Sequence, residues 1–195
     1  MLKSALVAVD FQNAFFSPSG SFLLRGGGIL NSSQIIANTH RLIEYAKKNN
    51  HLIIFTRLEF RSDYSDAGLL VSEIAPEIRS LRGYLENSCD SEIIDELLET
   101  ACEAVTISKN RYDPFNSSNI NCILKTNNIR QLYFCGALTN VCVEATVRSA
   151  FENDYYVTVV EDATSTYSKS AHEASLATIA NHYGKLISTQ TLISK

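Results

Sequence analysis

The sequence lacks any run of Lys and Arg, and its charges nearly balance. Its 195 residues include 17 Lys and Arg against 21 Asp and Glu, for a formal net charge of −4. Nucleic-acid-binding surfaces depend on clustered positive charge, so we expect no nucleic-acid partner. No apolar run approaches the roughly 20 residues of a membrane-spanning helix, so we expect no membrane partner either. The N-terminus enters a strand pattern at once rather than a signal peptide.

Cysteine and histidine are also scarce. The five cysteines are an odd number, and no pair has CxxC spacing: Cys89, Cys102, Cys122, Cys135 and Cys142. This usage favours reduced thiols in a cytoplasmic protein over a disulfide framework or a zinc site. The four histidines are scattered, and we expect them at the surface or at helix ends: His40, His51, His172 and His182. We therefore expect no metal and no cofactor, since metal sites need converging ligands.

Short apolar segments alternate with amphipathic ones along the chain. The apolar segments predict strands at 5–9, 52–56, 104–108, 132–135, 156–160 and 185–188. Helical spacing of apolar residues between them predicts helices. The alternation predicts an α/β protein with a three-layer α/β/α arrangement. We expect an open, six-stranded, mainly parallel, Rossmann-like sheet in a single domain over residues 1–195.

Two long segments, 12–30 and 58–85, show no clear periodicity. Long irregular segments in a compact domain usually cover a functional site. Within the first segment, residues 25–29 read Arg-Gly-Gly-Gly-Ile. They lack the Gly-Lys-Ser/Thr of a P-loop and do not directly follow a strand, so a turn or a flexible cover is favoured over a phosphate-binding loop.

Three reactive side chains follow predicted strands. Asp10 and Lys109 end the first and third strands, and Cys142 follows the fourth. Each has an ordinary alternative, because such an Asp is often a turn residue, such a Lys is often solvated and a free Cys is often buried in the core. Parallel strands bring their carboxyl ends to one edge of the sheet, where open α/β sheets bind ligands. Their joint occurrence there predicts a catalytic trio.

The trio has a coherent chemistry. Cys142 is expected in the first turn of a helix, where unpaired N–H groups and the helix dipole stabilise a thiolate. Asp10 would take the thiol proton as general base, and Lys109 would keep Asp10 ionised and favour the thiolate. The Cys142 N–H and a neighbour from 136–139 would stabilise an oxyanion. We expect attack on an amide-like carbonyl, release of an amine and hydrolysis of a thioester.

Three motifs resemble the isochorismatase-like cysteine hydrolases. They are Val-Ala-Val-Asp-Phe-Gln-Asn-Ala-Phe-Phe at 7–16, Lys-Asn-Arg-Tyr-Asp-Pro-Phe at 109–115 and Gly-Ala-Leu-Thr-Asn-Val-Cys-Val at 136–143. A weaker match is Val-Val-Glu-Asp-Ala-Thr at 159–164. The similarity runs in order along nearly the whole chain. It implies Cys142 as nucleophile, Asp10 as base and Lys109 as third member, and members of this family commonly form homo-oligomers.

The resemblance also suggests residues around the trio. It implies a non-proline cis peptide between Ala137 and Leu138, which would aim the Leu138 N–H into the oxyanion hole beside that of Cys142. It further implies that Phe15, Tyr112 and Phe115 line the substrate pocket, although ordinary core packing explains all three equally well.

The nicotinamidase branch of this family carries a metal motif, Asp-x-His, after its second strand. Residues 56–68 correspond to that stretch and contain no histidine. The chain is more similar to the metal-free amidohydrolases, which act on small ureido, carbamoyl or linear amide compounds. Two alternatives remain open: an isochorismatase, which cleaves a vinyl ether to release pyruvate, and a non-catalytic binding or scaffold protein.

Overall fold

The apolar segments form the strands of a twisted parallel sheet. The computed structural model describes residues 2–194. The strands are β1 (Ser4–Val9), β2 (Leu52–Leu58), β3 (Val105–Lys109), β4 (Gln131–Ala137), β5 (Tyr156–Ser165) and β6 (Lys185–Ile187). All six predicted strands are confirmed, and β5 runs five residues beyond its predicted end at residue 160.

The strand order creates a crevice at one edge of the sheet. Within the described residues the order is β3-β2-β1-β4-β5-β6, and every neighbouring pair is parallel. The chain moves from β1 outward through β2 to β3, and then returns to β4 on the other side of β1. The carboxyl ends of β1 and β4 therefore flank the point where the direction reverses, which is where such sheets bind ligands.

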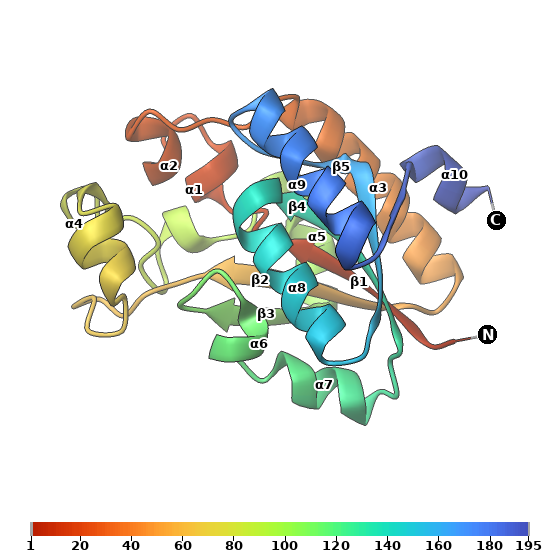
Figure 1. Cartoon of the computed structure of the whole chain (residues 1–195). Coiled ribbons are helices and arrows are strands. Elements are labelled where there is room, and N and C mark those ends of the chain that lie inside the picture. The colour runs from red at the N-terminus through yellow and green to blue at the C-terminus, as the bar shows by residue number, and fades with distance from the viewer. Residues whose placement is uncertain (1, 195) are drawn as a thin grey trace.

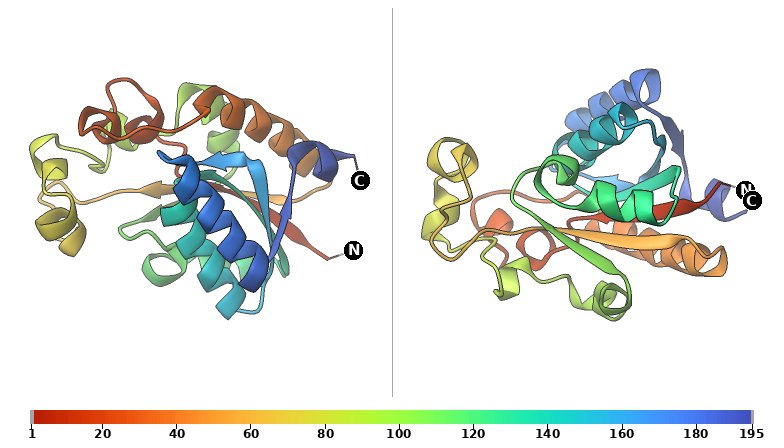
Figure 2. Two further views of the ribbon diagram at one scale, coloured as in Figure 1. Left: turned by 45° about the horizontal axis from the view of Figure 1, so that its top comes forward. Right: turned by 90° about the horizontal axis from the view of Figure 1, so that it is seen from below.

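Helices cover both faces of the sheet (Figures 1 and 2). On one face lie α3 (Ser32–Lys48), α5 (Asp95–Glu103) and α10 (Thr189–Ile193), packed on Leu6 and Ala8 of β1. On the other face lie α7 (Ile120–Thr126), α8 (Glu144–Glu152) and α9 (Lys169–His182), packed on Val7 and Val9. Alternate residues of a strand point to opposite faces, so both faces of β1 are apolar. The three-layer α/β/α prediction is confirmed.

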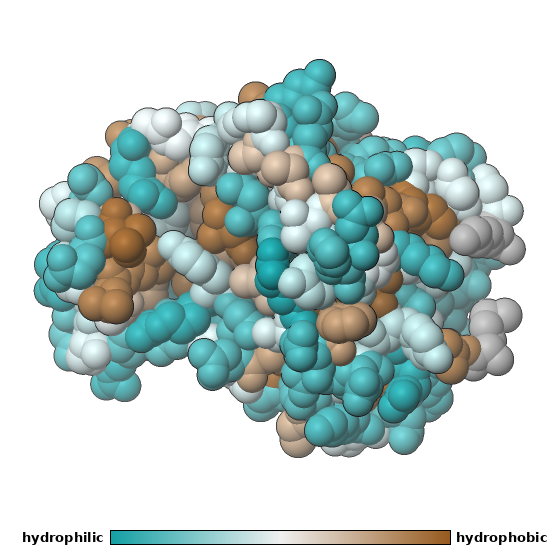
Figure 3. All heavy atoms as spheres, in the orientation of Figure 1, coloured by the Kyte–Doolittle hydropathy of each residue, from teal (hydrophilic) through white to brown (hydrophobic). Residues whose placement is uncertain are grey.

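The two irregular segments pack together over the carboxyl edge of the sheet. They contain short helices that periodicity did not reveal: α1 (Asn13–Phe16), α2 (Ser21–Leu24), η1 (Leu70–Ile74) and α4 (Glu77–Ser80). A separate apolar cluster joins them, with Phe15 and Phe22 from the first segment and Phe60, Ile78 and Tyr84 from the second. Apolar side chains also gather on the surface over α4 (Figure 3).

Candidate active site

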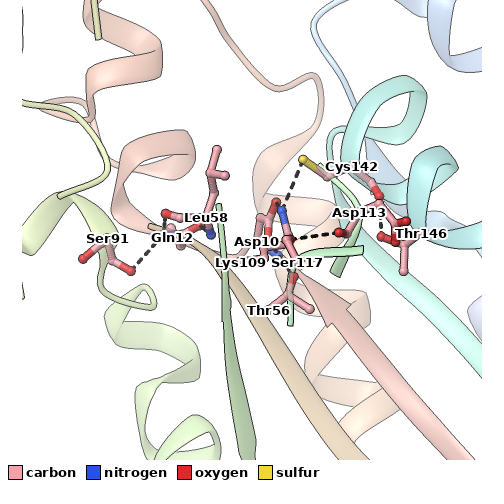
Figure 4. A network of polar contacts seen from close by, with 10 residues as sticks. All are labelled: Asp10, Gln12, Thr56, Leu58, Ser91, Lys109, Asp113, Ser117, Cys142 and Thr146. Atoms are coloured by element: carbon pink, nitrogen blue, oxygen red, sulfur yellow. Dashed lines mark hydrogen bonds and ion pairs between the residues drawn. The ribbon is translucent and has the colours of Figure 1, made fainter. Parts of the chain in front are cut away.

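Asp10 lies directly after β1 with a left-handed backbone, at φ 53°. Asp is among the few non-glycine residues that tolerate this region. Its side chain is completely buried, and both carboxylate oxygens have partners (Figure 4). The Thr56 hydroxyl donates to Oδ1 at 2.6 Å, and the Lys109 ammonium donates to Oδ2 at 2.7 Å. The carboxylate is therefore held in one orientation as half of a buried ion pair.

Lys109 ends β3 and reaches across β2 to the crevice between β1 and β4. Its Nζ donates to Asp10 and lies 3.6 Å from the Cys142 Sγ, so it bridges the two groups (Figure 4). Burial alone would lower the pKa of this amine. The Asp10 carboxylate, which accepts a hydrogen bond from this amine, outweighs burial together with the Cys142 sulfur and raises the pKa above its usual 10.5. Lys109 is therefore a fixed cation.

Cys142 lies in η3 (Thr139–Val143), a wide helical turn of the π type that leads directly into α8. It is 2% exposed. Burial raises the pKa of its thiol, Lys109 opposes that effect, and the adjacent Asp10 carboxylate adds to it. The direction of this pKa shift is opposite to the expected stabilisation of a thiolate, because desolvation outweighs the effect of the Lys109 cation. The sulfur thus lies in a desolvated position, in contact with the Lys109 ammonium and close to the Asp10 carboxylate.

The backbone before Cys142 approaches β1 closely. Gly136 has φ 114°, and a Cβ on it would lie 2.1 Å from the carbonyl oxygen of Val9. Only glycine fits this position without displacing the strand. The peptide bond between Ala137 and Leu138 is cis, as the resemblance implied. On the far side, the Thr146 hydroxyl donates to the carbonyl of Cys142 at 2.6 Å.

A polar network fixes the start of η3. The hydroxyl of Thr139 lies 3.0 Å from that of Thr164 and 2.9 Å from Nδ1 of His172. Thr164 in turn donates to the carbonyl of Gly136 at 2.7 Å. The expectation that all four histidines are surface or capping residues is wrong for half-buried His172, and also for His51, whose ring lies between two tyrosine rings. These contacts join elements distant in sequence, so spacing could not reveal them.

A cavity of about 200 Å³ opens at the sulfur of Cys142. Its lining is mostly apolar and aromatic: Phe15, Phe22, Arg25, Leu58, Leu70, Ile78, Tyr84, Tyr112, Leu138, Val141, Cys142 and Tyr167. Phe15, Tyr112 and Leu138 are thus placed in the cavity wall. The expectation for Phe115 is wrong, because it packs on Tyr155, with ring centroids 5.9 Å apart, and on the core beneath α7 and α8.

Two residues that support the trio were missed from sequence. Thr56 looks like one more β-branched residue of β2, yet it orients Asp10. Gln12 is fully buried and bonds the backbone of Leu58 and Ser91, which ties the segment after β1 to the end of β2 and to the turn at 89–91 (Figure 4). The only available signal for Gln12 was its place in the Asp-x-Gln motif.

Residues 2–194 hold neither a metal-binding cluster nor a membrane-spanning helix. No group of three or more His, Cys, Asp or Glu side chains there could hold a metal ion. In the same range, no helix combines the length and apolar character needed to cross a membrane.

Comparison with known proteins identifies the class to which this fold and site correspond. The family model for the isochorismatase domain matches residues 4–191. The chain belongs to the isochorismatase family, whose members include hydrolases.

Solved structures agree on the fold. A cysteine hydrolase from Pseudomonas syringae is 24% identical, with a TM-score of 0.88 over 98% of this chain and 91% of that one. An isochorismatase family protein from Desulfovibrio vulgaris is 20% identical, with a TM-score of 0.87 over 100% and 98%. An N-carbamoylsarcosine amidase from Thermoplasma acidophilum is 23% identical, with a TM-score of 0.74 over 96% and 97%.

Proposed function

We propose that this protein is a cysteine-dependent hydrolase that cleaves a C–N bond in a small amide, ureido or carbamoyl compound through a thioester intermediate. One observation carries the proposal. The Lys109 ammonium contacts both the Asp10 carboxylate, at 2.7 Å, and the Cys142 sulfur, at 3.6 Å, beside a mostly apolar cavity. A nucleophile, a base and a cation in contact are the groups that covalent acyl transfer needs.

The first half of the reaction forms the thioester. Asp10 takes the Cys142 proton as the sulfur bonds to the substrate carbonyl carbon. The cation of Lys109, 3.6 Å from the sulfur, offsets the negative charge that develops there. The C–N bond then breaks, and Asp10 returns the proton to the leaving nitrogen.

The second half regenerates the enzyme. Asp10 takes a proton from water as the water oxygen bonds to the thioester carbonyl carbon. The C–S bond breaks, the acid leaves, and Asp10 returns the proton to the sulfur of Cys142. Both halves pass through a tetrahedral intermediate that carries an oxyanion. We assign the stabilisation of this oxyanion to the N–H groups of Leu138 and Cys142, because both residues line the cavity.

The cavity supports a small substrate. Its volume of about 200 Å³ is below the roughly 300–1,000 Å³ of sites for drug-sized ligands. The structural similarity to an N-carbamoylsarcosine amidase agrees with C–N chemistry. We propose that catalysis needs no metal, because the trio supplies the nucleophile, the base and the positive charge.

Ammonia release from a panel of small amides, ureas and carbamoyl amines tests the proposal. We expect wild-type protein to release ammonia from at least one compound and Cys142→Ala to release none, with an unchanged circular dichroism spectrum. Wild-type turnover by Cys142→Ala would contradict covalent catalysis. Pyruvate release from isochorismate, without ammonia from any amide, would instead favour vinyl ether cleavage. Ligand binding without release of ammonia or pyruvate would favour a non-catalytic binding or scaffold protein.

The proposal also includes a reducing, cytoplasmic setting and a homo-oligomer. All five cysteines are free thiols. Light scattering that finds only monomers would contradict the oligomer.

A further inference from the structure

The cavity beside Cys142 carries one charged wall residue that the proposed chemistry does not use. Among the described lining residues, Arg25 alone has a formal charge, and none is acidic. Lys109 and Asp10 do not line the cavity but pair with each other behind the sulfur. Arg25 therefore places a single positive charge on the space where a substrate would lie.

The Arg25 guanidinium is held by an aromatic ring rather than by a carboxylate. Its Cζ lies 5.0 Å from the centroid of Phe22, within the range of a cation–π contact. The backbone of Gly27 supports that ring, because a Cβ on Gly27 would lie 2.6 Å from it. Across residues 2–194, no Asp or Glu oxygen lies within ion-pair distance of Arg25. No acidic side chain in this range therefore competes with an anionic ligand for this guanidinium.

Tyrosine hydroxyls accompany this cation. Tyr84 and Tyr112 line the same cavity as Arg25. Burial raises the pKa of both phenols, and the positive charge of Arg25 opposes this effect at each. Both phenols keep their protons at neutral pH and can donate hydrogen bonds. Tyr167 adds a third hydroxyl to the lining. A guanidinium with phenol donors at an apolar cavity matches a carboxylate, which a guanidinium binds through paired, charge-assisted hydrogen bonds.

We propose that Arg25 binds a carboxylate group of the substrate, so that the preferred substrates are small anionic amides or ureido acids. Because it rests on the proposed function, this assignment needs a test that can fail separately from C–N cleavage.

Matched substrate pairs provide that test. Succinamate and butyramide differ by a carboxylate in place of a methyl group, as do N-carbamoylglycine and ethylurea. We expect Arg25→Gln to lower kcat/KM for the anionic member by about 10- to 100-fold, mainly through KM, and to leave the neutral member within about threefold. Arg25→Lys should fall between wild type and Arg25→Gln. Arg82→Gln removes an exposed arginine outside the cavity and should change neither member.

Isothermal titration calorimetry on the Cys142→Ser protein measures substrate affinity in the absence of turnover. We expect succinamate to bind more tightly than butyramide, and this preference to disappear in Cys142→Ser/Arg25→Gln. Equal losses on both members of a pair, or an unchanged preference in Arg25→Gln, would overturn the assignment while leaving C–N cleavage intact. If no amide is hydrolysed, the proposed function fails and calorimetry still decides the carboxylate site: a preference for succinamate that depends on Arg25 supports it, and anything else overturns it.

Discussion

Replacing Lys109 by methionine tests the ion pair at the centre of the site. Methionine keeps much of the side-chain volume but removes the ammonium that donates to Asp10 at 2.7 Å. The Asp10 carboxylate is completely buried, so the substitution leaves a charge without a counterion. One hydrogen bond, from Thr56, remains on that carboxylate. We expect a lower free energy of unfolding and a loss of hydrolysis.

The expected magnitude follows from burial. Breaking a buried ion pair by removing one partner typically costs about 3–5 kcal/mol, a large part of the roughly 5–15 kcal/mol of total stability. The folded-state pKa of Lys109 is raised above 10.5. Its contribution is therefore fully present below pH 10.5 and is lost only as the pH rises through the folded value. Neutral pH lies within this window.

Urea denaturation followed by circular dichroism near neutral pH measures the effect. We expect Lys109→Met to lower the free energy of unfolding by about 3–5 kcal/mol, and Asp10→Asn/Lys109→Met to recover part of that loss because no charge remains buried. Both variants should be inactive. A Lys109→Met protein within about 1 kcal/mol of wild type would refute the reasoning, as would a double variant less stable than the single one.

Three further predictions concern the surroundings of the trio. Thr56→Val removes the donor to Asp10 Oδ1, and we expect a loss of about 1–3 kcal/mol in denaturation together with slower hydrolysis; unchanged activity would contradict an orienting role. Gly136→Ala should cost about 3 kcal/mol or more, because its Cβ would lie 2.1 Å from the Val9 oxygen; wild-type stability would show that the backbone adjusts freely. Since burial raises the pKa of Cys142, iodoacetamide should alkylate it more slowly at neutral pH than the exposed cysteines and faster as the pH rises, as measured by peptide mass spectrometry; fastest labelling at neutral pH would contradict the burial effect.

The local pattern of apolar residues was sufficient to predict the strands of the sheet and the positions of Asp10, Lys109 and Cys142 relative to them. Each residue lies at or just beyond the carboxyl end of a strand, and parallel pairing brings such ends together. The short helices of 12–30 and 58–85 could not be predicted in this way. They have too few turns to show a period, and they are stabilised by packing on each other.

Phe115 and His172 were misassigned from the sequence for one reason, which is that each contacts a distant part of the chain. Phe115 belongs to a motif that resembles a pocket segment, but its ring packs against Tyr155 from a distant part of the chain. His172 lies on a helix that looks exposed, yet its ring meets Thr139 33 positions away. The spacing of residues along the sequence predicts neither contact, because each depends on which helices and strands become neighbours in the fold.

The amino-acid sequence by itself thus determined the sheet, its carboxyl edge and the three reactive side chains at that edge. The periodicity of apolar residues and the ends of strands are local properties of a sequence. Tertiary structure alone decided the burial of Cys142, which raises the pKa of its thiol, and the placement of Arg25 in the cavity wall. Both depend on how two segments far apart in sequence close over the sulfur and exclude water from it.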